Sequence, residues 1–324
     1  MEVFIRSALL AAGSIFLAIP APAADTGRAL LAPGTSYVRE GSAFAVTQIR
    51  PALFALSEPD YYQHNVSYVI VGEDRALVID AGASTTEDIT RAVRRLTDKP
   101  FAVIPTHLHY DHIGSIQHFQ EVWMIDVPAT RELVRKDGFT YVPPDRHIAT
   151  AAEFSATPFK VSRYIKPGDT IDLGDRPVQI LFAPGHTRDE IVIYSPLDNI
   201  LFTGDFIYPA GLFSGNAKDY LESTDRVLAT INRDTKIYGA HPGRPKGGVT
   251  ELPLVTYDEV VNARVTFARM AKSAPGDETI SNPAPTGRFK IIAASVYRSS
   301  PRIRVLGDIV FADRPAFSYR DTMP

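Results

Sequence analysis

A short cluster of histidines and an aspartate carries the strongest chemical signal in this chain. His107, His109 and His112 fall within six residues, together with Asp111. The 324-residue chain holds only eight histidines, so this density is not expected by chance. Imidazole nitrogens and carboxylate oxygens are ligands that zinc and related metal ions accept. The cluster therefore predicts a metal site on a loop.

Three more potential ligands lie further along the chain. Each follows a short apolar run that predicts a β-strand, and each has a glycine one or two residues before it. Glycine permits tight turns and close approach of the backbone to a site. The three ligands, with the preceding runs, are His186 (178–182), Asp205 (200–202) and His241 (236–238).

Five histidines and two aspartates are enough to hold two metal ions about 3.5–4 Å apart, the arrangement of two-metal hydrolases. We expect two zinc ions, although iron and manganese also accept nitrogen and oxygen ligands. The expected ligands are His107, His109 and His186 for one ion, Asp111, His112 and His241 for the other, and Asp205 as a bridge between them.

The elements that must position these ligands can be outlined from the sequence. The run at 101–105 predicts the strand that leads into the histidine cluster. Ser84 and Glu87 form a capping box, which predicts a helix from there to about Leu96. Two late apolar runs, at 289–296 and 303–311, predict closing strands. Strands in runs with helices between them predict packed sheets with helices outside.

The ordered motif resembles that of the metallo-β-lactamase superfamily, over roughly residues 43–245. This resemblance implies an αββα sandwich of two mixed β-sheets with helices on the outside and the site at one edge. It implies the same seven ligands. It also implies that Asp80, at the end of an early strand, supports the metal loops without binding metal. Residues 24–324 are then a single domain of this kind with a C-terminal extension.

Within the superfamily the signals favour two substrate classes. The segment Gly185-His186-Thr187-Arg188-Asp189 resembles that of zinc β-lactamases. Many of those enzymes have a cysteine where this chain has Asp205, and a lysine where it has Tyr208. The aspartate resembles lactonases and glyoxalase II-type thioesterases instead. We expect hydrolysis of a β-lactam or lactone, with a thioesterase or other ester hydrolase as the alternative. A nuclease, a di-iron redox protein and a non-catalytic metal-binding protein are further alternatives.

The expected mechanism is attack of a metal-bridging hydroxide on a carbonyl. Asp111 and Asp205 are the predicted catalytic residues, since both would bind metal and orient the nucleophile. Asp80 and Thr187 are predicted to fix the tautomers of the histidine ligands. The predicted substrate contacts come from Tyr208 and Asn216, both in the segment that follows Asp205.

Composition and the N-terminus constrain location and partners. The chain is 45% hydrophobic and 22% charged with a net charge of −3, which argues against nucleic acid as a partner. It has no cysteine, so thiolate ligands and disulfides are excluded. Residues 1–23 resemble a signal peptide, because Arg6 precedes an apolar run and Ala21-Pro22-Ala23 follows it. We therefore expect a periplasmic or secreted protein with no stable membrane insertion after cleavage, acting on a small carbonyl substrate.

Overall fold

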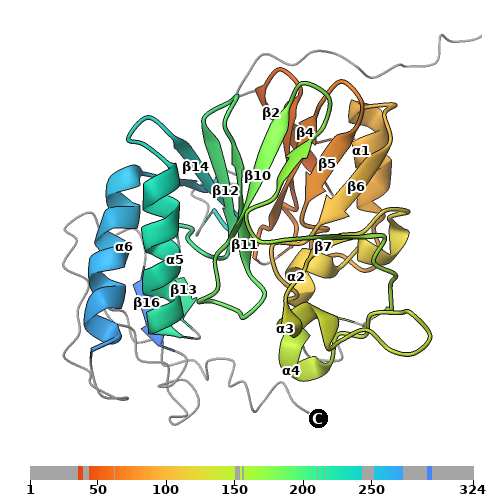
Figure 1. Ribbon diagram of the computed structural model, residues 1–324. Coiled ribbons are helices and arrows are strands. Elements are labelled where there is room, and N and C mark those ends of the chain that lie inside the picture. Colours follow the sequence, from red (N-terminus) through yellow and green to blue (C-terminus); the bar gives the residue numbers. More distant parts are fainter. Residues whose placement is uncertain are drawn as a thin grey trace, which may run out of the picture.

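Two six-stranded β-sheets lie face to face, with helices on the outer face of each (Figure 1). The computed structural model describes residues 36–38, 44–61, 63–149, 154, 157–209, 211–214, 216–242, 252–272 and 290–293. Each sheet contains antiparallel pairs and one parallel pair. The expected αββα sandwich of two mixed sheets is therefore confirmed.

The first sheet is formed by the N-terminal half of the described chain, with its strands in sequential order. All neighbours are antiparallel except the last pair, which is parallel and connected through helix α1 (Ile89–Leu96). Its strands are β1 (Ser36–Val38), β2 (Ala45–Arg50), β3 (Leu53–Ser57), β4 (Val66–Val71), β5 (Ala76–Ile79) and β6 (Phe101–Ile104).

The second sheet is formed by the C-terminal half in the order β15-β14-β12-β11-β10-β9. The parallel pair is β12 with β14, which are joined through helix α5 (Ala217–Thr230). Its strands are β9 (Thr170–Asp172), β10 (Pro177–Phe182), β11 (Ile191–Ser195), β12 (Ile200–Gly204), β14 (Lys236–Gly239) and β15 (Leu254–Val255).

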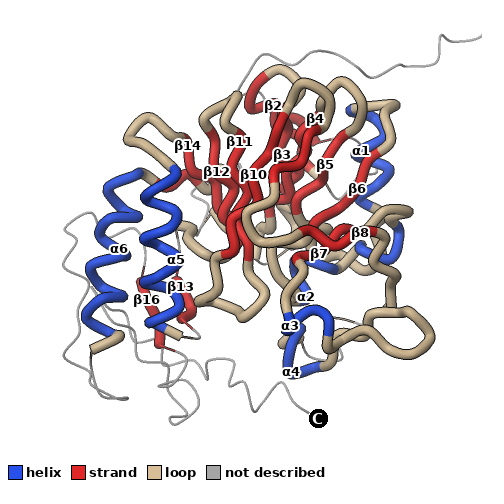
Figure 2. The backbone as a smooth tube through the Cα atoms, in the orientation of Figure 1, coloured by secondary structure: helices blue, strands red, loops and turns tan. Residues whose placement is uncertain are grey.

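Short elements fill the region below the first sheet in the view of Figure 2, where α2, α3 and α4 lie near the β7–β8 pair. These elements are α2 (Tyr110–Ile113), a 3-10 turn (Ile116–His118), β7 (Trp123–Ile125), α3 (Pro128–Arg131), α4 (Pro144–His147) and β8 (Arg163–Ile165). Apart from α4, the described residues between α3 and β8 form turns, isolated β-bridges and irregular backbone.

Alternation along the strands separates three apolar layers. In β4, Tyr68 and Ile70 face the space between the sheets, whereas Val69 faces α1. This two-residue period is what a strand covered on both faces requires. A third layer packs the second sheet against α5 and α6 (Tyr257–Met270). The buried layers hold the strand ends, and hence the functional loops, in place.

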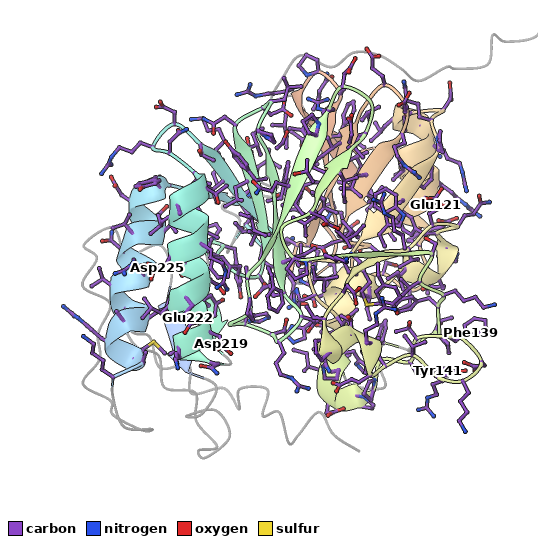
Figure 3. The ribbon with its side chains drawn as sticks, viewed as in Figure 1. Glu121, Phe139, Tyr141, Asp219, Glu222 and Asp225 are labelled. Atoms are coloured by element: carbon purple, nitrogen blue, oxygen red, sulfur yellow. The ribbon has the colours of Figure 1, made fainter. Side chains whose placement is uncertain are left out.

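Helix α5 shows how the sequence covers the outer face of the second sheet. Tyr220, Ser223 and Val227 are buried, while Glu222 and Asp225 are exposed on the outer face of the helix (Figure 3). Asn216 caps the helix, since its side-chain oxygen accepts hydrogen bonds from the backbone N–H groups of the first turn.

The start of α1 differs from the prediction. The side chain of Ser84 accepts a hydrogen bond from the Glu87 N–H at 3.0 Å, as a capping box would require. The helix nevertheless begins at Ile89, and Asp88 is its N-cap through a 2.9 Å bond from the Thr90 N–H. The Ser84 interaction closes a separate turn, because Asp88 offers a stronger acceptor immediately before the apolar face of the helix.

Several predictions concern the ends of the chain. The late run at 289–296 is confirmed in part by β16 (Lys290–Ala293), which pairs in parallel with β13 (Gly211–Ser214). The predicted strand at 303–311 and the predicted signal peptide at 1–23 lie outside the described residues. None of the described helices has the length and apolarity needed to cross a bilayer.

A buried ion pair ties the two sheets together at one end. The guanidinium of Arg176 donates to both carboxylate oxygens of Asp198, at 2.8 and 2.9 Å. It also donates to the carbonyls of Ala52 and Val71 in the first sheet, at 3.3 and 3.0 Å. Both partners are at least nine-tenths buried, so neither charge has water as a substitute partner.

We expect Asp198→Ala to destabilise the protein by about 3–5 kcal/mol, because it leaves the Arg176 charge buried and unpaired. Urea unfolding of the metal-free protein measures this. The matched control is Asp258→Ala, which breaks the exposed 2.7 Å pair with Arg233 and should cost less than about 1 kcal/mol. Equal losses in the two variants would show that the Arg176 pair is no stronger than a surface contact.

Candidate metal centre

The predicted ligands are brought together at one edge of the sandwich. The His107–His112 cluster follows β6 of the first sheet, and α2 carries its last two ligands. His186, Asp205 and His241 follow β10, β12 and β14 of the second sheet. Strand pairing makes these three strands run in one direction, so their carboxyl ends share an edge. Both sheets therefore contribute to one centre.

Close backbone approach at this edge requires Gly204. This residue has φ +51°, and a Cβ there would lie 2.4 Å from the Thr106 hydroxyl. Any side chain would therefore collide with the loop that leads into the histidine cluster. Backbone bonds from Ile191 N–H to Thr106 O and from Ala240 N–H to Gly204 O hold the loops side by side.

The first ligand group contains His107, His109, His186 and Asp205. One donor atom from each lies within 4.8 Å of the others. The His186 Nε2 is 3.0 Å from the His109 Nδ1. The His107 ring is 4.4 Å from that of His109 and 4.9 Å from that of His186, centre to centre.

The second ligand group contains Asp111, His112 and His241, again with donor atoms within 4.8 Å of one another. The His241 Nε2 lies 3.4 Å from the Asp111 Oδ2. The His112 Nε2 lies 3.8 Å from the other oxygen of the same carboxylate.

Asp205 lies between the groups. Its Oδ2 is 3.7 Å from the His186 Nε2 of the first group. Its Oδ1 is 3.1 Å from the His241 Nε2 and 3.5 Å from the His112 Nε2 of the second. The two oxygens of one carboxylate thus face different groups, which is the geometry a bridging ligand needs.

The atoms that face the centre fit a metal site. The Nε2 atoms of His107, His112 and His241 and the Oδ1 of Asp205 are buried, and none makes a well-aligned hydrogen bond within the described residues. Such groups are costly to bury without partners, and nitrogen and oxygen donors converging at this spacing suit zinc, iron or manganese. The chain therefore holds a histidine–aspartate centre able to bind metal.

The electrostatics of the two groups differ. Burial lowers the pKa of His107 and His109 well below the usual range, and the neighbouring imidazoles add to the effect. Burial acts in the same direction on His241, but Asp205 and Asp111 raise its pKa to about 10. Burial would raise the pKa of Asp111, yet His112 and His241 lower it to about 2. The first group therefore favours neutral imidazoles at His107 and His109, whereas carboxylates offset the charge of the imidazoles in the second.

The Asp80 carboxylate fixes both Thr106 and His112. It accepts hydrogen bonds from the Thr106 N–H at 2.6 Å and the Thr106 hydroxyl at 3.1 Å. It lies 2.9 Å from the His112 Nδ1, so the Nε2 of that ring is the nitrogen left facing the ligand group. Asp80 has φ +64°, a conformation that a non-glycine residue adopts only where the surroundings enforce it.

Three other residues that the sequence predicted for the site lie outside both ligand groups. Tyr208 is 4% exposed, and its ring lies edge-on to His241 at 5.1 Å. Asn216 is exposed and uses its side-chain oxygen to cap α5. Thr187 lies beside Asp189, a buried carboxyl whose pKa is raised by burial and lowered in part by Arg146 and by Thr187. The roles of Tyr208 and Asn216 in substrate binding, and of Thr187 in fixing a histidine, stay predictions.

Two residues near the centre were missed by sequence reasoning. Glu58 is 3% exposed, and its carboxylate accepts hydrogen bonds from the N–H groups of Ala83 and Ser84. Asn65 donates a 2.8 Å hydrogen bond to the Asp111 carbonyl. Both lie in the segment that joins β3 to β4, and no local sequence signal marks them as buried.

Comparison with known proteins agrees with this geometry. The chain matches the family described as the metallo-beta-lactamase superfamily over residues 62–245. Because this match spans more than half of the 324 residues, the chain belongs to that superfamily and is a metal-dependent hydrolase.

Individual relatives include two named thioester hydrolases. The chain is 31% identical over 213 residues to the acyl-coenzyme A thioesterase MBLAC2 of Gallus gallus, covering 59% of this chain and 76% of that protein. It is 27% identical over 186 residues to the hydroxyacylglutathione hydrolase of Xanthomonas axonopodis pv. citri (strain 306), covering 56% of this chain and 62% of the relative.

Among solved structures, a metallo-beta-lactamase from Pontibacter korlensis superposes with a TM-score of 0.50 at 17% identity. The superposition covers 69% of this chain and 99% of that protein. At this level of identity the similarity shows the fold alone.

We expect Asp80→Asn to weaken metal binding about 10–100-fold, because the amide cannot accept both the Thr106 donors and the His112 Nδ1–H. Asparagine tolerates the left-handed backbone, so the fold should be preserved. Chelator competition measures the affinity, and exposed Asp74→Asn is the control. Unchanged affinity in Asp80→Asn would rule out this positioning role.

Glu58 should make the stability of the metal-free protein depend on pH. Burial raises its pKa from 4.5 to about 7. The folded state therefore binds this proton more tightly than the unfolded state, and the contribution is fully present below pH 4.5 and is lost as the pH rises through about 7. The free energy of unfolding, compared with that of Glu58→Gln in chelator, should fall by about 3 kcal/mol over this range. Parallel pH profiles for the two proteins would contradict the prediction.

Proposed function

We propose that this protein is a dinuclear zinc hydrolase that cleaves acyl thioesters. The observation that carries the proposal is the Asp205 carboxylate, whose two oxygens face separate ligand groups. An oxygen bridge at this position was the feature that distinguished the thioesterase resemblance from that of many β-lactamases. The names of the two relatives, a coenzyme A thioesterase and a hydroxyacylglutathione hydrolase, support the same class.

The chemistry of the leaving group also supports a thioester. Metal ions bound here would supply Lewis acidity and a water that ionises near neutral pH. The His107 and His112 rings, held by Thr106 and Asp80, present their Nε2 atoms in fixed directions. The buried Asp111 carboxylate, with its pKa lowered to about 2, can accept a hydrogen bond from the nucleophile and orient it. A thiolate, with a pKa of about 8.5, then leaves without a proton donor, whereas an amine would need one.

A β-lactam or lactone is the second candidate, on the sequence resemblance of the His186 segment. In the structure, however, the aspartate of that segment has a structural role. Asp189 is buried and lies 3.3 Å from the Arg146 guanidinium, so it shapes the turn and is not exposed to substrate. Tyr208 is buried and provides no cation for a lactam carboxylate. We therefore rank thioesters first, and we keep export through the signal at 1–23 as part of the proposal.

The experiment is a hydrolysis panel with the purified full chain, stripped with chelator and reloaded with zinc, iron or manganese. The panel contains a medium-chain acyl-coenzyme A, an acylglutathione thioester, an acyl-homoserine lactone and a chromogenic cephalosporin. Zinc-dependent thioester cleavage is the expected result. Cleavage of only the lactone or the cephalosporin would overturn the substrate proposal, and metal uptake without any cleavage would overturn catalysis.

Matched histidine variants test the site itself. We expect His107→Ala to reduce kcat/KM by at least about 1,000-fold, because it removes a ligand from the first group. His118→Ala removes an exposed histidine outside both groups and should leave the rate unchanged. If both variants retained wild-type kcat/KM, the proposed centre would not be the site of hydrolysis.

A further inference from the structure

The segment from Glu58 to Asn65 joins β3 to β4 and contacts the second ligand group. Besides backbone bonds among its own residues, its described hydrogen bonds reach that group or the backbone that holds it. The segment therefore supports the second group, which shares Asp205 with the first.

Glu58 acts on the second group through an adjacent loop. Its carboxylate accepts hydrogen bonds from the Ala83 N–H at 2.8 Å and the Ser84 N–H at 3.0 Å. The same loop is bonded to the ligand-bearing helix α2, with Ala81 N–H donating to His112 O and Gly114 N–H donating to Gly82 O, both at 2.8 Å. Glu58 thereby fixes the loop at residues 81–84, which is hydrogen-bonded to α2.

The other end of the segment contacts the ligand residues directly. Asn65 Nδ2 donates to the carbonyl of Asp111, in a bond that is fully buried. The carbonyl of Gln63 lies 3.2 Å from the His241 Nδ1, which assigns the proton of that ring to Nδ1 and leaves Nε2 toward the carboxylates. The Gln63 side chain accepts a 2.7 Å bond from Tyr110, the first residue of α2.

We propose that residues 58–61 and 63–65 position the second ligand group and set its metal affinity separately from that of the first. This inference rests on the proposed dinuclear function. It assigns positioning roles to Glu58 and Asn65, although neither residue is hydrogen-bonded to the side chain of a ligand. Because outer partners of metal ligands usually change affinity about 10–100-fold when removed, the effect should be measurable in binding alone.

The test is stepwise zinc binding to the metal-free full chain, by calorimetry with chelator competition. Wild type should bind two ions in two steps. In Asn65→Ala and in Glu58→Ala the dissociation constant of one step, the same step in both variants, should rise about 10–100-fold, while that of the other stays within about twofold. Glu58→Gln keeps one acceptor oxygen and should lie between Glu58→Ala and wild type.

Controls separate positioning from general destabilisation. Asp60→Asn alters an exposed residue of the same segment and should leave both steps unchanged. Urea unfolding of the metal-free variants checks that each is folded at the assay temperature, and if Glu58→Ala fails to fold, Asn65→Ala carries the test.

Two results would overturn the inference: equal weakening of both steps, or no change in either. Uptake of a single ion by wild type would do the same. Hydrolysis of the panel is measured separately, so two-step zinc binding with a selective loss in the variants would support the inference even if no thioester were cleaved.

Discussion

The centre depends on compensation of charge among side chains that are almost fully buried. Asp111, His112 and Asp205 are each at most 5% exposed, and their charges are balanced by one another and by Asp80 and His241. Burial raises the pKa of the Asp205 carboxyl, but His241 and His112 hold it well below its usual range. An isolated charge at this depth would cost several kcal/mol. The framework therefore has to deliver all partners together, which explains why each strand end is tied to its neighbour.

Much of this arrangement could be predicted because each candidate ligand belongs to a short sequence motif. The His107–His112 cluster and the ligands His186, Asp205 and His241 each follow an apolar run, and strand ends of one direction meet at one edge. The layered fold follows from the same pattern of strands and helices. The clustering of these side chains could therefore be predicted without knowing any distance between the sheets.

Only part of the supporting structure could be predicted. The supporting role of Asp80 was expected from the family resemblance, but its left-handed backbone conformation is not specified by its sequence neighbourhood. Glu58 and Asn65 contact residues 25 and 46 positions away, so their roles depend on how the loops fold over one another. The start of α1 was misassigned since Ser84 and Asp88 both satisfy the rules for an N-cap, and only packing of Ile89 decides between them.

The Arg176–Asp198 pair and the metal centre lie at opposite ends of the same strands. Arg176 precedes β10 and Asp198 precedes β12, whereas His186 and Asp205 follow these strands. Between these ends the sheets meet mainly through apolar contacts, which have no directional preference, with one hydrogen bond from the Tyr68 hydroxyl to the Gly239 carbonyl. The Arg176–Asp198 pair at one end and the contacts of the metal centre at the other therefore oppose sliding or rotation of one sheet against the other. A slip of one residue at either end would misplace ligands from opposite sheets, so the far ion pair helps to define the registration on which the centre depends.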